Sequence, residues 1–158
     1  ELSTWPVFGI LAKLARTIFI NRSSSSAVKQ LQLIEHLLLK SERLILFPEG
    51  TSSDGRKVLP FKPSLFEAPI RADAIVQPLT IRYEKINGMP VDRRSKPLLA
   101  WYGAMHLLPH LRQSLSVGTI TIKIVFHEPI RAIVFSNRKQ LAKHCQTIIA
   151  LELEKPNR

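Results

Sequence analysis

The sequence has one cysteine, few aromatic residues and no long hydrophobic run. Because Cys145 is the only thiol, a disulfide framework and a multi-cysteine metal cluster are excluded, and a reducing compartment is expected. No apolar run approaches the roughly 18 residues that a membrane-spanning helix needs. Aromatic residues make up 7% of the chain and form no RNP-like block. The single cysteine argues against a fold stabilised by disulfide bonds, and the low aromatic content argues against an RNA-recognition fold.

Acidic residues are also scarce: 12 of them face 23 basic residues, and the formal net charge is +11. A surplus of this size predicts attraction to nucleic acid, anionic lipid or phosphorylated substrates. The cations are scattered in ones and twos, and the chain has neither zinc-ligand spacing nor a Walker lysine motif. The charge therefore leaves an anionic membrane surface and phosphorylated molecules open as partners, and no nucleic-acid partner is expected.

With 45% hydrophobic residues and no internal repeat or linker, residues 1–158 are expected to form a single domain. Hydrophobic spacing predicts helices at 5–15, 28–38, 61–70, 107–115 and 136–153, and strands at 17–20, 44–47, 75–83 and 120–126. Pro78 implies an edge or a bulge in the third strand. The alternation of strands and helices predicts an α/β fold with a mixed, largely parallel sheet flanked by helices.

The strand at 17–20, the following helix and the strand at 44–47 predict a βαβ unit, in which both strands end at the same sheet edge. Arg22 and Glu49 follow these two ends. A carboxylate beside an apolar strand needs a partner or ligand, and a guanidinium can bind phosphate through two hydrogen bonds. An ordinary turn containing Gly50 and Gly55, with Arg22 solvated or paired to Glu49, explains the same residues. The residues alone leave both interpretations open.

Three segments resemble, in order, conserved blocks of the glycerolipid, or lysophosphatidic acid, acyltransferase family (PlsC-like). Residues 17–22 (TIFINR) resemble the second block, whose arginine binds the phosphate of the acceptor, and residues 47–51 (FPEGT) resemble the third, which shapes the acceptor site. Residues 76–79 (VQPL) resemble the fourth, near the acyl donor. Lys62 matches a lysine that commonly follows the third block. Residues 101–110 resemble a bacterial branch that includes ornithine-lipid acyltransferases.

The resemblance implies transfer of a fatty acyl group to the hydroxyl of a lysophospholipid, as in conversion of lysophosphatidic acid to phosphatidic acid; lyso-ornithine lipid is the alternative acceptor. It implies acyl-CoA or acyl carrier protein as co-substrate, no bound cofactor and no metal. It also implies a peripheral or anchored position at the cytoplasmic face of the bacterial inner membrane. The implied acceptor-binding residues are Arg22, Glu49, Gly50, Thr51, Ser52 and Lys62, with Pro78 on the acyl-donor side.

Two departures from the family pattern matter. Ser52 stands where the family usually has an arginine, so Arg56 or Lys62 is expected to compensate. The family's first block, a histidine followed five positions later by an aspartate, supplies the general base, and none of the five histidines here has that aspartate. We therefore expect the pair upstream of Glu1. The 158 residues are then an N-terminally truncated acyltransferase domain that is inactive alone.

The missing pair also allows an alternative of another class, a non-catalytic module that binds anionic lipid through its basic surface. His127, at the end of a predicted strand, is the candidate substitute base, although a hydrogen-bonded structural role is the more common one for such a residue. Cys145, on the last predicted helix, is expected to be a small core residue rather than a nucleophile.

Overall fold

The computed structural model describes residues 24–155, and their side chains from residue 28 onward. The predicted helix at 5–15, the predicted strand at 17–20 and Arg22 lie outside the described residues. The helices are α2 (Ser24–Leu39), η2 (Pro63–Phe66), α3 (Glu67–Arg71), α4 (Lys96–Leu99), α5 (Leu107–Leu115), η3 (Ala132–Val134) and α6 (Arg138–Glu154). The strands are β1 (Ile75–Val76), β2 (Leu79–Ile86), β3 (Met89–Pro90), β4 (Ile120–Phe126) and β5 (Ile130–Arg131).

The strands form two small sheets, of order β3-β2-β4 and β1-β5. Every pairing among residues 24–155 is antiparallel. The mixed α/β class is confirmed, but the largely parallel sheet is not found in this part of the chain. The predicted strand at 75–83 breaks at residues 77–78, because Pro78 cannot donate a ladder hydrogen bond, so that β1 pairs with β5 and β2 with β4.

The prediction of a buried strand at residues 44–47 is wrong for the described structure. This segment is neither helix nor strand and belongs to no sheet. The side chain of Leu46 packs on the core, whereas Ile45 is 81% exposed and Phe47 75% exposed. A strand needs a hydrogen-bonded neighbour, and the one predicted for it at 17–20 lies outside the described residues. The parallel βαβ pairing therefore stays a prediction.

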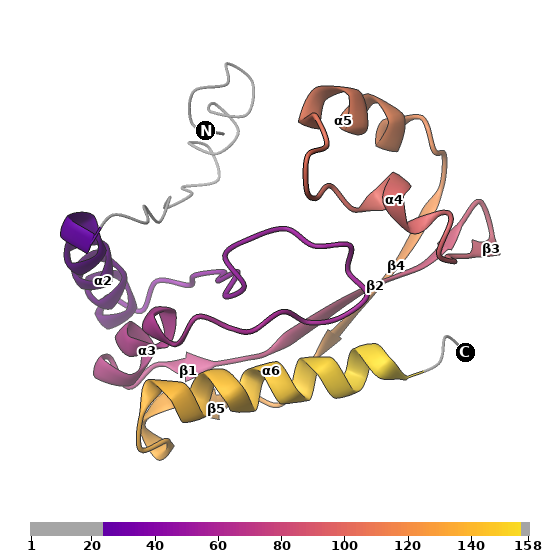
Figure 1. The fold of residues 1–158 in the computed structure, drawn as a ribbon. Coiled ribbons are helices and arrows are strands. Elements are labelled where there is room, and N and C mark those ends of the chain that lie inside the picture. Colours follow the sequence, from indigo (N-terminus) through magenta and orange to yellow (C-terminus); the bar gives the residue numbers. More distant parts are fainter. Residues whose placement is uncertain (1–23, 156–158) are drawn as a thin grey trace.

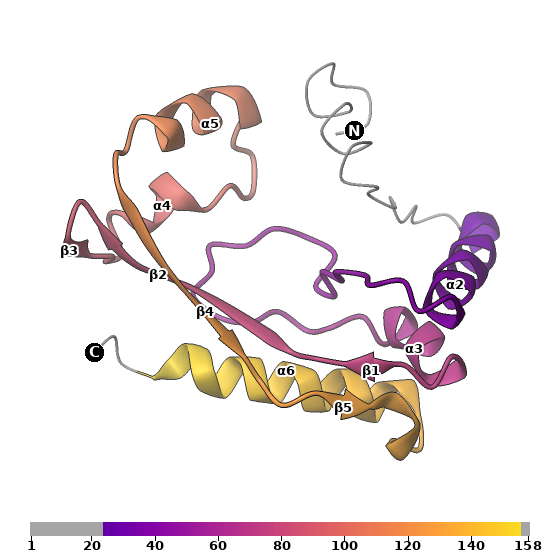
Figure 2. The same ribbon diagram turned by 180° about the vertical axis from the view of Figure 1, so that it is seen from behind.

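The core lies where α6 covers η2, β1 and the start of β2 (Figure 1). Its buried residues are Phe61, Phe66, Ala132, Leu141, Ala142 and Cys145. Figure 2 shows the same arrangement from behind, where β5 lies in front of α6. Helix α6 begins at Asn137, whose side-chain Oδ1 accepts hydrogen bonds from the backbone N–H groups of Lys139 and Gln140 at 3.0 and 3.1 Å. This N-cap satisfies two donors that the first turn leaves free.

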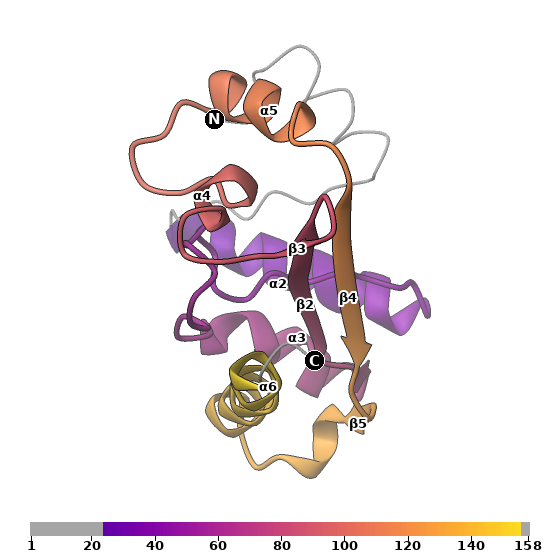
Figure 3. The same cartoon turned by 90° about the vertical axis from the view of Figure 1, so that its right-hand side faces the viewer.

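Strands β2 and β4 form a long ribbon that runs from α6 toward α5 at the opposite end of the molecule (Figure 3). Near α6, the buried guanidinium of Arg82 on β2 donates to the backbone oxygens of Glu152 and Lys155, at 3.2 and 2.7 Å. These bonds satisfy carbonyls at the C-terminal end of α6, where a cation is favoured. The ribbon therefore anchors α6, and α6 in turn packs against the loop that follows α2.

Candidate functional site

The FPEGT segment forms a tight turn at residues 47–50. The backbone N–H of Gly50 donates to the carbonyl of Phe47 at 3.2 Å. Pro48 occupies the second turn position, which its fixed φ favours, and Gly50 has a φ of +63°, which favours glycine. The N–H of Lys62 donates to the carbonyl of Pro48 at 2.9 Å. Residues 48–62 therefore form a loop that is closed at its base, which we call the acceptor loop after the role that the sequence predicts for it.

The half-buried carboxylate of Glu49 lies inside this loop. Burial raises its pKa above the ordinary range, and a hydrogen bond from the backbone N–H of Leu59 partly offsets that rise. The carbonyl of Leu59 accepts a long hydrogen bond, 3.4 Å, from the side-chain amide of Gln146 on α6. Glu49 is thus connected through Leu59 to the core helix. Sequence reasoning missed this link because the residues lie far apart along the chain.

Gly50 and Lys62 lie against each other across the acceptor loop. A Cβ atom added at Gly50 would lie 2.5 Å from the Nζ of Lys62 and 2.9 Å from its Cε. The lysine ammonium therefore lies directly over the Gly50 backbone, at a distance that glycine alone permits. Thr51 and Ser52 are exposed on the same loop. The structure thus brings five of the six predicted acceptor residues together, while Arg22 lies outside the described residues.

Arg56 and Lys62 are the two residues expected to replace the arginine that is absent at position 52. The Nε of Arg56 lies 3.0 Å from Oδ2 of Asp54, and the backbone N–H of Arg56 donates to Oδ1 of the same carboxylate. Arg56 is therefore engaged by a neighbouring acid, whereas Lys62 lies over the FPEGT turn. Of the two, Lys62 is therefore the better candidate for the cation that replaces the absent arginine.

The fourth-block residue Pro78 lies outside the acceptor loop, between β1 and β2. Pro78 is buried there, and its carbonyl accepts a hydrogen bond from the N–H of His127 at 3.1 Å. Leu46, just before the FPEGT turn, and Val76, two residues before Pro78, both pack against the core cluster. The third and fourth blocks are therefore attached to one hydrophobic cluster.

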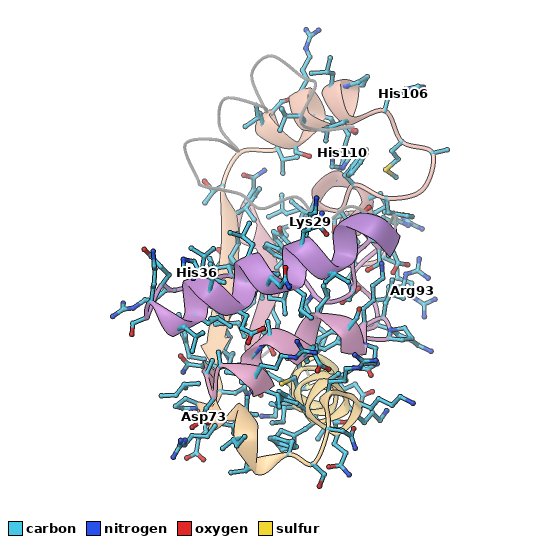
Figure 4. The ribbon with its side chains drawn as sticks, turned by 90° about the vertical axis from the view of Figure 1, so that its left-hand side faces the viewer. Lys29, His36, Asp73, Arg93, His106 and His110 are labelled. Atoms are coloured by element: carbon cyan, nitrogen blue, oxygen red, sulfur yellow. The ribbon has the colours of Figure 1, made fainter. Side chains whose placement is uncertain are left out.

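Three histidines are engaged in structural hydrogen bonds or ring packing. The Nε2 of His127 lies 2.8 Å from the Oγ1 of buried Thr80, and the Nε2 of His110 lies 3.0 Å from the carbonyl of Pro97. The ring of His144 packs against Phe135, with ring centres 5.0 Å apart. The other two, His36 and His106, are exposed on α2 and beside α5 (Figure 4). These surroundings agree with the structural role expected for His127.

Cys145 is buried in the core cluster, as the sequence predicts. Burial raises the pKa of its thiol to about 11. A thiol with so high a pKa is protonated at neutral pH and is a poor nucleophile. Within residues 24–155, the structure has no helix that is both long and apolar enough to cross a bilayer, and no cluster of three side chains that could ligate a metal.

Comparison with known proteins gives consistent matches. The model of the Acyltransferase family matches residues 1–82. The lyso-ornithine lipid O-acyltransferase of Brucella abortus is 40% identical over 151 residues, which are 90% of this chain and 57% of that protein. The 1-acyl-sn-glycerol-3-phosphate acyltransferase of Neisseria gonorrhoeae is 32% identical, over 80% of this chain and 48% of that protein.

The fold is similar to the crystal structure of PlsC, the 1-acyl-sn-glycerophosphate acyltransferase of Thermotoga maritima. The TM-score is 0.62 at 21% sequence identity, over 98% of this chain and 53% of that one. At this identity the likeness concerns the fold. The chain spans roughly half the length of the curated relatives it matches.

Proposed function

Because the chain belongs to the acyltransferase family, we propose that it forms the acceptor-binding part of an enzyme that acylates a lysolipid. The acyl donor is a thioester, acyl-CoA or acyl carrier protein, and the acceptor is the free hydroxyl of the lysolipid. The observation that carries this proposal is the closed acceptor loop, in which the FPEGT turn, the Glu49 carboxylate and the Lys62 ammonium are held together.

The proposed reaction needs a base that takes the proton of the acceptor hydroxyl as its oxygen attacks the thioester carbonyl. The new C–O ester bond forms, the C–S bond breaks, and the thiol leaves with a proton, so no covalent enzyme intermediate is required. The base is a histidine paired with an aspartate five positions later, which the 158 residues do not contain. The acceptor loop binds and orients the headgroup, and Arg22 is the proposed further cation for an anionic group.

Among the acceptors, lyso-ornithine lipid is favoured over lysophosphatidic acid. A phosphate monoester calls for several cations, but in the acceptor loop Arg56 is engaged by Asp54 and position 52 holds a serine. An ornithine headgroup carries both an amine and a carboxylate. At the same turn, Glu49 provides a carboxylate for the amine and Lys62 provides an ammonium for the carboxylate. The greater similarity to the Brucella abortus relative supports the same choice.

The test uses the chain joined to a family segment that carries the histidine–aspartate pair. We expect this protein to acylate lyso-ornithine lipid more efficiently than lysophosphatidic acid. Ser52→Arg should raise the relative use of lysophosphatidic acid about tenfold, because a charge-assisted hydrogen bond to phosphate contributes roughly 1.5–3 kcal/mol. Ser53→Arg is the matched control for added charge. If Ser53→Arg raised the relative use of lysophosphatidic acid as much as Ser52→Arg does, the assignment of position 52 to the headgroup would be contradicted.

A second candidate function is a non-catalytic module that binds anionic lipid. The absence of a histidine–aspartate pair from the 158 residues and the net charge of +11 favour it. The joined protein distinguishes the two functions. A binding module would still bind lysolipid through the acceptor loop, but it would transfer no acyl group from a thioester even with the histidine–aspartate pair present.

The acceptors are membrane lipids, so we also propose that the protein works at a membrane surface. The basic charge agrees with an anionic surface and with acidic acyl donors such as acyl carrier protein.

A further inference from the structure

Residues 91–118 form a projection that contains α4 and α5, which we call the α4–α5 lobe. It lies at the far end of the β2–β4 ribbon from the β1–β5 sheet (Figures 1 and 3). In Figure 4, His106 and His110 lie at one end of the molecule, Asp73 lies at the other end, and Arg93, at the start of the lobe, lies between them. The lobe contributes no residue to the acceptor loop or to the core cluster. The chemistry of its surface therefore needs another explanation.

The inner face of α5 is fixed against α4. The hydroxyl of Ser114 donates to the carbonyl of Leu98 at 2.6 Å, and the Nε2 of His110 lies 3.0 Å from the carbonyl of Pro97. Both side chains lie on the same face of α5, and this face also carries the half-buried Leu107 and Leu111. Because these contacts determine how α5 is rotated, they also determine which residues point to solvent.

The outer face of α5 is apolar and cationic. Leu108 is 61% exposed and Leu115 is 77% exposed. These two leucines are seven residues apart on the helix, so they share one face, and the exposed Arg112 lies between them. A shallow, open depression runs along this face, lined by Leu108, Pro109, Arg112, Gln113 and Ser116.

The charge of the whole lobe has one dominant sign. It contains Arg93, Arg94, Lys96 and Arg112, but a single carboxylate, Asp92. The Asp92 carboxylate accepts hydrogen bonds from Ser95 and Arg94, and the Ser95 bonds are the main cause that holds its pKa below the ordinary range. The lobe thus combines the protruding leucines of α5, which have Arg112 between them, with three further cations in the segment that leads into and begins α4. Exposed apolar residues together with cations are typical of helices that lie in the interface of anionic membranes.

From these observations we propose that the outer face of α5, with the cations of the α4–α5 lobe, docks the protein on an anionic lipid bilayer. A nine-residue helix is about 13 Å long, too short to supply by itself the roughly 800 Å² per partner that a stable protein interface buries. A lipid surface has no such size requirement, and each of the four cations adds about 1 kcal/mol near an anionic bilayer, to which the two leucines add their partition into lipid. The inference deepens the proposed function, because the lysolipid acceptor resides in that bilayer.

The experiment is co-sedimentation of the 158-residue chain with vesicles of phosphatidylcholine, with and without phosphatidylglycerol. Binding should require phosphatidylglycerol and weaken as salt is added. The double variant Leu108→Ser/Leu115→Ser should bind about tenfold more weakly, since both leucines lose their partition into lipid. The matched control is Leu39→Ser/Leu151→Ser, which changes leucines that are 64% and 60% exposed on α2 and α6. It should bind like the unmodified chain.

An equal loss in the control, or an unchanged affinity in the lobe variant, would overturn the proposal, as would equal binding to vesicles without phosphatidylglycerol. In the protein joined to a histidine–aspartate segment, the lobe variant should keep acyl transfer to lysolipid dispersed in detergent and lose transfer to lysolipid in vesicles. If unmodified chain binds anionic vesicles through the lobe but the joined protein transfers no acyl group, the proposed function fails and the docking surface stands.

Discussion

The contact between Gly50 and Lys62 can be tested with a pair of glycines in the same loop. Gly50 and Gly55 have nearly the same φ, +63° and +66°. A Cβ added at Gly55 meets no atom within 4 Å, whereas one added at Gly50 would lie 2.5 Å from the Nζ of Lys62. Gly55→Ala therefore changes backbone energy alone, and Gly50→Ala also displaces the lysine.

The expected stability change is nearly the same for both variants. An alanine at positive φ costs roughly 1–2 kcal/mol, and the lower entropy of the unfolded alanine chain offsets about 0.4–1 kcal/mol of this. The net loss is about 1 kcal/mol, or about 2–4 °C in Tm for a chain of this size. Because the exposed Lys62 side chain can swing away, its displacement adds little to the stability loss.

The functional change should differ sharply. In the protein joined to a histidine–aspartate segment, we expect Gly50→Ala to lower kcat/KM for lyso-ornithine lipid about tenfold, as one headgroup contact is lost. Gly55→Ala should leave it unchanged, and Lys62→Ala should reproduce the Gly50→Ala effect without the stability loss. If the two glycine variants lower acceptor use equally, Gly50 does not act by placing Lys62.

Three further predictions concern stability and reactivity. Glu49→Gln should raise the free energy of unfolding at pH 7. Burial raises the pKa of Glu49 in the folded state, so folding favours the protonated carboxyl. The stability that this protonation provides is lost as the pH rises through the folded pKa, whereas glutamine stays neutral at every pH. This advantage over the unmodified chain should vanish below about pH 4 in pH-dependent urea titrations, where the carboxyl is protonated in both states; an advantage that grows in acid would contradict the burial argument. Cys145 should resist maleimide at pH 7 until the chain unfolds, because burial raises the pKa of its thiol to about 11, and rapid labelling of the folded chain would refute its place in the core. Asn137→Ala should cost about 1 kcal/mol in the same titrations by removing the N-cap of α6, whereas Asn137→Asp keeps the capping oxygen and should cost little; equal losses in the two variants would contradict the capping role.

The parts of the fold that depend on local periodicity were predictable from the sequence. The predicted helix at 107–115 and strand at 120–126 coincide with α5 and β4, and the helix predicted at 136–153 differs from α6 by one or two residues at each end. The helix predicted at 61–70 appears as two short helices, η2 and α3, with Pro63 at the first position of η2. In each case the spacing of apolar residues and the positions of proline act within a few residues of chain.

Features that depend on distant partners were not predictable in this way. Residues 44–47 have the composition of a buried strand, but pairing is non-local, and in the described structure they have no neighbouring strand.

The hairpin from β2 to β3 depends on a local signal that the sequence analysis did not use. Asn87 and Gly88 both have positive φ and form a two-residue turn, which favours this dipeptide.

The candidate site divides in the same way. From the FPEGT motif and the lysine that follows it, the amino-acid sequence predicts Glu49, Gly50 and Lys62 as one group, and the structure places Lys62 against Gly50. The same sequence leaves Arg56 and Lys62 as equal candidates, because the pairing of Arg56 with Asp54 depends on the conformation of the loop. The hydrogen bond from Gln146 to Leu59 joins residues 87 positions apart, and no local pattern indicates it.

We propose that Glu49, Gly50 and Lys62 bind the acceptor, and that the base belongs to a histidine–aspartate pair, which the 158 residues lack. The most direct measurement is thioester-dependent acylation of lyso-ornithine lipid by the 158-residue chain alone and by the chain joined to a family segment with the histidine–aspartate pair. We predict no turnover by the first and sustained turnover by the second. Turnover by the 158-residue chain alone would place the base within it, and a folded joined protein without turnover would contradict the assignment of the acceptor site.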